Sequence, residues 1–389
     1  MINSRLTIFA FLKHYQIGDR HFSYEPYVRE LIYWSEIFEE ITLYTEVRKD
    51  NPVFSISELP PNILVESLYF RSGGGLKNNL IRILQLPILF FQIVFAYRKS
   101  ELIHTRSSGF PTMIVNLLNL IFNKPTIEKW ATNAPPDKKL GVLTSVNFRL
   151  LLLSPSNTRV FAYTEVRSKN FLLAFPALFS LKEIEIFRSY IPKNKWRQSE
   201  RKFVSVARLH QDKNLDVIFE SVRLGKLGNR LTPGFELYII GDGPLFKEYD
   251  DFIIKNGLEG IIFLMGKMTY YDTIKFVSKC NFLIMPGVNE GWPKVINEAL
   301  IVDTVPIVVS QGNAKVVMDR LDSPGLLFND NSESLLSTIK LAESLSIEEI
   351  IEMLNIGNSK NKNLTLDKYK ELIVNTFHDI QGYKVLSDQ

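Results

Sequence analysis

The sequence predicts an α/β fold made of two doubly wound domains with parallel sheets. The chain has 389 residues, which is enough for two domains of ordinary size. Its second half alternates strand and helix patterns, as in parallel sheets covered by helices on both faces. The first half is less regular, but its strand-like runs and helical stretches fit the same architecture.

In the first half, short runs rich in β-branched and aromatic residues indicate strands. These predicted strands are Leu6–Leu12, Glu40–Glu46, Ile63–Phe70, Leu102–Arg106, Pro125–Trp130 and Thr158–Tyr163. The stretch from Phe187 to Lys202 is polar and interrupted by proline, so we place the link between the domains there. The predicted domains are residues 1–190 and 191–365, followed by a charged helical tail, residues 366–389, that could pack back on the first domain.

In the second half, six apolar runs predict strands that alternate with helices. The strands are Phe203–Ala207, Phe235–Ile240, Ile261–Met265, Asn281–Met285, Val305–Ser310 and Gly325–Asn329. Helical spacing covers Asn214–Leu224, Leu245–Asn256 and Tyr271–Lys279. Open parallel sheets bind ligands beyond the carboxyl ends of their strands, so the loops after these strands are the candidate site.

Composition indicates a soluble globular protein, with 46% hydrophobic and 23% charged residues. The single cysteine, Cys280, lies in an apolar run and excludes a disulfide framework within the chain. We therefore expect a reducing, cytoplasmic location. The segment Met1–Leu12 is too short and too strand-like for a signal peptide.

The net charge of +4 hides an asymmetry between the two halves. Residues 1–200 contain 25 Lys+Arg and 17 Asp+Glu, a net +8, whereas residues 201–389 contain 21 and 25, a net −4. The basic half could attract anionic lipid headgroups or a phosphate-linked substrate. Alternatively, it is an ordinary solvated surface.

The apolar stretch Leu80–Tyr97 raises the question of membrane contact. Arg82, Pro87 and two glutamines within it argue against a spanning helix, which needs ~20 predominantly apolar residues. Two interpretations stay open: a core helix of the first domain, or a helix lying at the inner face of the membrane.

The most informative segment is Pro286–Leu300, which contains Glu290 and Glu298. Glu290 follows a predicted strand in a loop rich in glycine and proline, and Glu298 lies on the helix that follows. Pro293 suits the first turn of that helix. The N–H groups of a helix N-terminus bind anions, and carboxylates accept hydrogen bonds from hydroxyls. A polyhydroxylated ligand with a phosphate would suit this place.

Three other strand ends carry phosphate-like motifs. Arg208 and Lys213 follow the first strand of the second half and could hold a diphosphate, or they could be a solvated pair at a helix start. Gly241-Asp-Gly243-Pro lacks the third glycine of a dinucleotide fingerprint but permits close backbone approach. The Gly-Lys267-Met268 turn offers backbone groups beside a cation.

Other chemistries lack their motifs. The sequence has no Walker motif, no Gly-x-Ser-x-Gly elbow, no His/Cys cluster with metal spacing and no Asp-x-Asp. It also contains no recognisable nucleic-acid-binding module, and its basic residues are scattered. Its five histidines are dispersed. His14 and His104 could point into a cleft, or they could be structural.

Four blocks of the second half carry a family resemblance. They are Val206–Lys213, Ile240–Pro244, Phe263–Lys267 and Glu290–Ala299. In this order and spacing they resemble the nucleotide-sugar-binding domain of retaining glycosyltransferases of the GT-B fold, in particular family four. The resemblance covers the region from Val206 to Ala299 and implies two Rossmann-like domains that face each other across a cleft.

The resemblance implies a role for each site residue. Arg208 and Lys213 would hold the donor diphosphate and stabilise the leaving group, and Glu290 would contact the transferred sugar. Glu298 would bind the ribose, and the backbone around Lys267 and Met268 would meet the base. The backbone near the helix N-terminus would face the sugar and phosphates, at Gly291, Trp292, Pro293, Lys294 and Val295. Gly241 and Gly243 join this donor set. Such enzymes need no protein nucleophile, metal or cofactor.

The chain departs from the family pattern mainly in its first half. Lys13–Arg20 replaces the usual glycine-rich loop, and Trp130-Ala-Thr132 stands near the place of a common acceptor-domain histidine. Ala207, Gly287 and Asp303–Pro306 differ at the edge of the donor site without removing its charged residues. By position, the acceptor-side candidates are His14, Arg106 and Trp130.

The sequence thus predicts a hexosyltransferase-type enzyme. It would move a sugar from a nucleotide sugar to a saccharide or lipid-linked acceptor with retention of configuration, in surface polysaccharide or glycan synthesis. Two alternatives stay open: a nucleotide-sugar epimerase on the same fold, and a module of this fold that binds without turnover.

Overall fold

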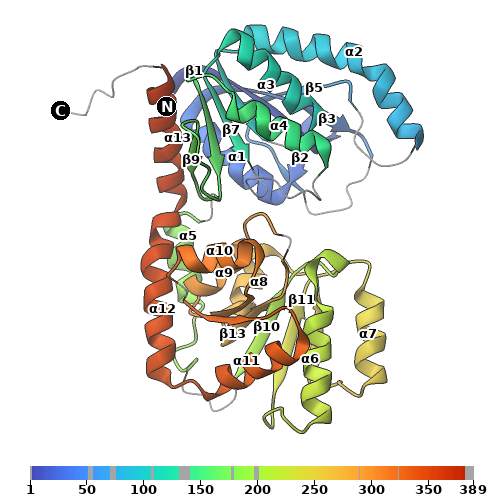
Figure 1. Ribbon diagram of the computed structural model, residues 1–389, viewed down its shortest axis with the longest axis vertical. Helices are drawn as coiled ribbons and strands as arrows, with labels where there is room; N and C mark the ends of the chain where they lie inside the picture. The colour runs from blue at the N-terminus through green and yellow to red at the C-terminus, as the bar shows by residue number, and fades with distance from the viewer. Residues whose placement is uncertain are drawn as a thin grey trace, which may run out of the picture. The chain divides into compact units, whose positions relative to one another are not determined.

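The structure is a computed structural model of the chain. It describes residues 2–50, 56–70, 76–106, 109–130, 141–176, 179–196, 201–288, 290–322 and 324–381. The chain divides into two compact units (Figure 1). Unit 1 is Met1–Ala177 with Asp367–Gln389, and unit 2 is Leu178–Leu366.

Unit 1 is built on one sheet with the strand order β4-β2-β1-β6-β7-β8-β9, in which β3 pairs with β1 and β5 pairs with β3. All pairs are parallel except β1–β2 and β2–β4. The strands are β1 (Ile2–Ile17), β2 (Arg20–Tyr24), β3 (Phe38–Arg48), β4 (Ile56–Glu58), β5 (Ile63–Ser67), β6 (Leu102–Arg106), β7 (Thr126–Trp130), β8 (Thr158–Ala162) and β9 (Phe171–Leu173). The six predicted strands are all present.

The segment expected to be a loop after the first strand is a β-hairpin. Strand β1 continues to Ile17, the chain turns at Gly18 with φ 61°, and Ile17 pairs with Arg20 of β2. A two-residue turn with a glycine at positive φ is typical of tight hairpins. The prediction that β1 ends at Leu12 was wrong for this reason.

Helices cover both faces of the unit 1 sheet. Two neighbouring residues of β6 show this, since successive residues of a strand point to opposite faces. Ile103 of β6 packs in one core cluster with helices α2 and α3. The next residue, His104, stacks on Trp34 of α1 with ring centroids 4.2 Å apart, and Phe377 of α13 contacts Trp34 edge-on. The helices of this unit are α1 (Glu25–Ile37), α2 (Leu76–Lys99), α3 (Phe110–Phe122), α4 (Val142–Leu152) and α13 (Leu366–Gln381).

Unit 2 is a six-stranded, entirely parallel sheet with the order β12-β11-β10-β13-β14-β15. The strands are β10 (Lys202–Val206), β11 (Glu236–Ile240), β12 (Ile262–Gly266), β13 (Phe282–Met285), β14 (Val305–Val309) and β15 (Leu326–Phe328). The helices are α5 (Leu181–Ser189), α6 (Asp216–Leu227), α7 (Phe246–Lys255), α8 (Tyr270–Val277), α9 (Lys294–Ile301), α10 (Gly312–Arg320), α11 (Ser332–Ser344) and α12 (Ile347–Asn361). Short 3-10 turns lie at η2 (Gln211–Lys213) and η3 (Lys362–Leu364).

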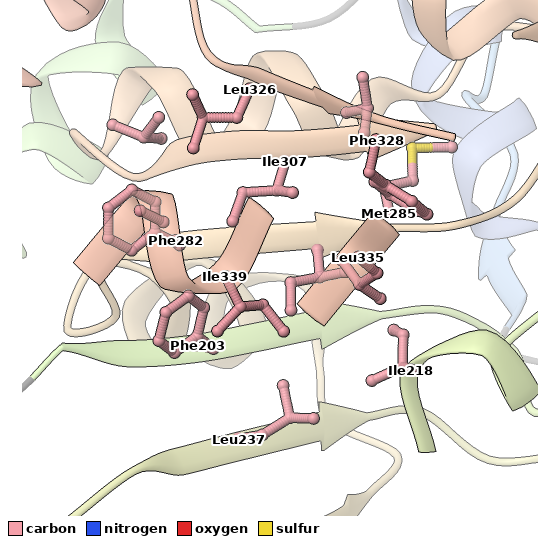
Figure 2. Close-up of a cluster of buried hydrophobic side chains, with 14 of the residues drawn as sticks. Phe203, Ile218, Leu237, Phe282, Met285, Ile307, Leu326, Phe328, Leu335 and Ile339 are labelled. Carbon is pink, nitrogen blue, oxygen red and sulfur yellow. The ribbon is translucent and has the colours of Figure 1, made fainter. Parts of the chain in front are cut away.

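Both faces of the unit 2 sheet carry apolar cores. On one face, Phe203 and Phe282 stack with ring centroids 5.3 Å apart and belong to a core cluster that includes residues of α6 and α11. Figure 2 shows this face, where Leu335 and Ile339 lie over the strands. On the other face, Val204 packs in a second cluster with residues of α5, α8 and α9.

The boundary between the units differs from the predicted link. Helix α5 belongs to unit 2, because its Phe187 is fully buried in the core cluster under that sheet. Residues 197–200 of the predicted link lie outside the described residues. The tail, which was predicted to be able to pack back on the first domain, belongs to unit 1 from Asp367 onward, and Tyr369 and Phe377 are almost completely buried there.

Helix α2 contains the predicted apolar stretch and continues through Pro87. One side of it is buried in the core of unit 1, at Leu89, Ile93 and Ala96. Among the helices that the structure describes, none has the length and apolar character needed to cross a membrane.

Candidate active site

The candidate site lies at the carboxyl edge of the unit 2 sheet, where the chain direction switches. From β10 the chain builds β11 and β12 on one side, then returns to place β13 directly beside β10 on the other. The loops after β10 and β13 therefore diverge from adjacent strands. Such switch points are where open α/β sheets bind ligands. This topology brings together Lys213 and Glu290, which are 77 residues apart in the sequence.

The loop after β10 presents Arg208 and Lys213 differently. The Arg208 side chain is 73% exposed, with Asp212 3.7 Å away as its ion-pair partner. The Lys213 side chain is only 13% exposed. Asn214 ends the η2 turn with φ 54°, a left-handed conformation that asparagine adopts readily. Arg208 is thus open to a ligand, whereas Lys213 is held in place.

Lys213 donates from Nζ to Oε1 of Glu290 at 2.6 Å, and its Nζ lies 3.7 Å from Oδ2 of Asp212. The carboxyl of Asp212 also lies 2.5 Å from Nδ1 of His210. Burial raises the pKa of Asp212, but the hydrogen bond with His210 and the charges of Lys213 and Arg208 outweigh it and lower that pKa. Two cations and two carboxylates therefore gather at the β10–β13 edge.

The loop after β11 packs by backbone contact against the loop after β10. A Cβ atom on Gly241 would overlap the carbonyl oxygen of Ala207, and one on Gly243 would overlap that of Leu209. Leu209 also donates its N–H to the carbonyl of Asp242 at 3.0 Å. In this structure the two predicted glycines are explained by this contact, which positions the segment that carries Arg208.

The loop after β13 is held by an asparagine from the next strand end. Asn313, at the start of α10, donates from Nδ2 to the carbonyls of Glu290 at 2.7 Å and Gly291 at 2.5 Å. Trp292 donates from Nε1 to Oδ1 of Asn297 at 2.8 Å. The residue Asn289 lies outside the described residues.

Helix α9 begins at Lys294, and Pro293 is its N-cap with φ −74°. Pro293 therefore stands one position before the first turn in which it was predicted. Lys294 donates its N–H to the carbonyl of Trp292, and Val295 packs against the cores on both faces. Glu298 lies inside α9, is partly buried and makes polar interactions of its own.

The loop after β12 carries Lys267 and Met268. Lys267 is exposed, and Met268 packs against the core cluster that contains α8. Thr269 caps α8, because its side chain accepts from the N–H of Asp272. The structure thus places the predicted donor residues in the loops after β10, β11, β12 and β13 and on helix α9, and a polar contact joins Lys213 to Glu290.

The acceptor-side candidates belong to unit 1 and have different environments. His14 is buried in β1 rather than in a loop, 3.0 Å from the carbonyl of Leu12 and 2.8 Å from Oγ1 of Thr45. Trp130 is fully buried, with its ring centroid 5.3 Å from that of Phe148. Ala131 and Thr132 lie outside the described residues. Only Arg106 reaches the surface, with 27% of its side chain exposed.

Arg106 belongs to a buried charge cluster that the sequence does not indicate. Its Nη1 lies 3.0 Å from Oε2 of Glu30, and Nζ of Lys129 lies 2.7 Å from the same oxygen. Burial raises the pKa of Glu30, but the two cations reverse this and bring it to about 2. Tyr369 of α13 lies under Lys129, with the ring centroid 5.5 Å from Nζ.

Sequence patterns missed the asparagines and the partners of Arg106 because none of these residues belongs to a recognisable motif. Asn313 and Asn214, which contacts Asp330 at 2.7 Å, lie at strand ends but belong to no charged or glycine-rich motif. Glu30 lies on α1 and Lys129 on β7, and the sequence alone suggests that charged side chains on these elements are exposed to solvent. Across the described part of the chain, no group of three or more His, Cys, Asp or Glu side chains could hold a metal ion.

Comparison with known proteins shows that the second half of the chain is similar to glycosyltransferases. Residues 187–357 match the family described as Glycosyl transferases group 1. An uncharacterized glycosyltransferase of Methanocaldococcus jannaschii is 28% identical over 140 residues. This match spans only 36% of that relative's length and 36% of this chain.

The whole chain is similar to solved structures. The Anabaena protein HepE, in complex with UDP, matches with a TM-score of 0.70 and 15% identity over 96% of this chain and 99% of HepE. Sucrose-phosphate synthase from Thermosynechococcus elongatus matches with a TM-score of 0.69 and 12% identity over 98% of this chain and 100% of that structure. The chain therefore has the GT-B fold of two Rossmann-like domains, and its residues 187–357 match the family model of the glycosyl transferases group 1.

Proposed function

We propose that the protein is a glycosyltransferase that takes a sugar from a nucleotide-sugar donor. The observation that carries this proposal is the Lys213–Glu290 pair at the switch point, with exposed Arg208 beside it. A cationic fork and an ammonium suit a diphosphate, and a neighbouring carboxylate suits sugar hydroxyls. HepE, which has the same fold, has been crystallised with UDP-glucose, and this supports a nucleotide sugar as the donor.

The proposed chemistry retains the configuration of the transferred sugar. The bond between the sugar C1 and the diphosphate oxygen breaks, and an acceptor hydroxyl forms the new bond on the same face. The acceptor proton passes to the departing phosphate, so no protein nucleophile is needed. Arg208 and Lys213 stabilise the negative charge that develops on the leaving diphosphate. Metal independence is part of the proposal and rests on the absence of Asp-x-Asp from the sequence.

In this proposal, Glu290 positions the hydroxyls of the sugar while accepting from Lys213, and Glu298 binds the ribose. Gly291 to Val295 present backbone groups at the start of α9 to the sugar and phosphates. We further propose that the acceptor is a saccharide or a lipid-linked saccharide used in surface polysaccharide or glycan synthesis, at the inner face of the cytoplasmic membrane. Arg106 is the acceptor-side candidate, because it alone of the three reaches the surface.

The experiment incubates the full chain with a panel of nucleotide sugars and follows release of nucleoside diphosphate, with and without membrane extract. Release that depends on the extract supports transfer. Conversion of the nucleotide sugar without release would favour an epimerase, and binding without any reaction would favour a non-catalytic module. Neither binding nor release across the panel would overturn the proposal.

The variant Arg208→Ala tests the diphosphate assignment. Arg208 is 73% exposed and pairs only at 3.7 Å, so its loss should leave the fold intact. We expect turnover to fall by about 100-fold or more, the effect of removing one charged group that stabilises a developing anion. The matched control is Arg20→Ala, because the Arg20 side chain is 69% exposed and also pairs with one carboxylate. Equal activity in the two variants would contradict the assignment.

A further inference from the structure

Helix α2 exposes a second apolar stripe on the side away from the core. Leu84, Ile88, Phe91 and Phe95 are 78%, 50%, 70% and 59% exposed. Their spacing of three and four residues places them on one face of the helix. The opposite side is buried in unit 1. A helix that needed only to cover the sheet would carry polar residues on this outer face, so the stripe requires another explanation.

The stripe continues onto α3 and α4. Helices α2 and α3 share a core cluster, and Asn116 of α3 donates to Asn147 of α4 at 2.7 Å. All three helices cover the same face of the sheet, because Ile103 of β6 and Trp130 of β7 point to that face in the paired register. Their outer sides therefore face the same way (Figure 1). Exposed apolar residues of α3 and α4 include Leu117, Ile121, Phe122, Val142 and Leu143.

The charge of this surface has one sign. Helices α2, α3 and α4 contain no Asp or Glu and five Lys or Arg, namely Lys77, Arg82, Arg98, Lys99 and Arg149. Arg98, Lys99 and Arg149 are exposed. Lys99 folds over the exposed ring of Phe95, with Nζ 4.1 Å from its centroid.

We propose that the outer surface of α2, α3 and α4 docks on an anionic lipid bilayer. Exposed phenylalanine and leucine enter the boundary between headgroups and acyl chains, and the lysines and arginines meet lipid phosphates. A second copy of the chain is the poorer occupant, because a symmetric dimer would oppose two positive surfaces. The inference specifies the membrane contact of the proposed function, but it does not depend on sugar transfer.

The test is co-sedimentation of the full chain with vesicles of phosphatidylcholine, with and without phosphatidylglycerol. We expect binding that needs phosphatidylglycerol and weakens as salt is raised. The double variant Phe91→Ser/Phe95→Ser should bind at least about tenfold more weakly, since it removes two large apolar contacts with the lipid. Both side chains are exposed, so the fold should survive.

The matched control is Leu227→Ser/Ile254→Ser in unit 2, where the side chains are 70% and 58% exposed. It should bind the vesicles like the unaltered chain. Absence of binding to phosphatidylglycerol vesicles, or equal binding by the two double variants, would overturn the inference. So would a dimer in solution that only the phenylalanine variant dissociates. If the chain binds vesicles but releases no nucleoside diphosphate from the panel of nucleotide sugars, the proposed transferase activity is contradicted and the membrane-docking surface is still supported.

Discussion

The Lys213–Glu290 pair joins two loops that diverge from adjacent strands, so each side chain has a structural and a chemical consequence. The Lys213 and Glu290 side chains are 13% and 22% exposed. Removing Lys213 leaves the Glu290 carboxylate partly buried without this cation, and removing Glu290 leaves Lys213 with Asp212 at the longer distance of 3.7 Å. Losing one partner of a partly buried pair costs more than the pair contributes. Stability and turnover can therefore be separated by combining the two substitutions.

We expect Lys213→Met to lower the free energy of unfolding by about 1–3 kcal/mol and to abolish detectable turnover. Glu290→Gln should lower stability by a similar amount. The double variant should recover much of that stability, because neither charge is then left alone, yet remain inactive. Urea unfolding and nucleoside diphosphate release measure the two quantities. A double variant whose losses of stability simply add would show that the pair is not coupled.

Gly241 provides a second test at the residue scale, because its backbone contact with Ala207 leaves no room for a side chain. Its φ is 146°, and an added Cβ would overlap the carbonyl of Ala207. Gly241→Ala must displace the segment that carries Arg208, so we expect loss of donor binding together with a large loss of stability. Gly260→Ala is the control: Gly260 has φ 76° but open space around it, so only the backbone cost of about 1 kcal/mol applies. Thermal unfolding and nucleotide binding distinguish the two, and equal effects would contradict the backbone contact.

At the level of elements, prediction succeeded where burial gives a continuous pattern. Strand β14, with the sequence Val305-Pro-Ile-Val-Val309, is buried at every position and was predicted with nearly its observed bounds. Strands β2 and β4 have mixed polarity and pair antiparallel at one side of the sheet, so their short sequences carry no such signal. Tertiary pairing, and not local preference, forms them.

The site shows the same division. Arg208, Lys213 and Glu290 were singled out because charged residues after buried strands stand out from their surroundings. Asn313, which fixes the carbonyls of Glu290 and Gly291, belongs to no motif, since any polar residue after a strand could be solvated. Its role depends on a contact 23 residues away, which no local spacing encodes.

The charge cluster of unit 1 joins α1, β6, β7 and α13, and it predicts a stability effect at this scale. Glu30→Gln would leave Lys129, only 3% exposed, and Arg106 without their carboxylate. We expect a loss of about 3–5 kcal/mol in urea unfolding. Adding Lys129→Met should recover part of it. Glu58→Gln, which removes an exposed partner of Arg20, should cost at most about 1 kcal/mol. A small effect of Glu30→Gln would show that the cluster is well solvated.

The two units of the whole molecule should respond differently to pH. In unit 1, burial lowers the pKa of His14 and of His104 from 6.5 to about 4. Between these values the unfolded chain binds protons that the folded unit does not. Unit 1 therefore loses stability as pH falls from 6.5 to 4, by up to about 3 kcal/mol for each histidine. Glu30 extends the loss, because its contribution disappears as pH falls from 4.5 to about 2.

In unit 2, burial lowers the pKa of Lys195 from 10.5 to about 7, where its Nζ donates to the carbonyl of Val302 and to Thr304. Above pH 7 the folded unit releases a proton that the unfolded chain keeps, so stability rises with pH. Burial raises the pKa of Cys280 from 9.0 to about 12, which cancels the rise in stability between pH 9 and 10.5 and makes stability fall at higher pH. Unit 2 should therefore gain about 2 kcal/mol between pH 7 and 9.

Hydrogen exchange at a series of pH values separates the units, because it reports the opening free energy of peptides from each one. Peptides of unit 1 should lose protection below pH 6.5 before those of unit 2 do, and peptides of unit 2 should gain protection from pH 7 to 9. Lys195→Met should abolish that gain, since it removes the only group invoked for it. If the gain persists in this variant, or if both units change together at every pH, then the buried side chains named here do not set the pH dependence of folding.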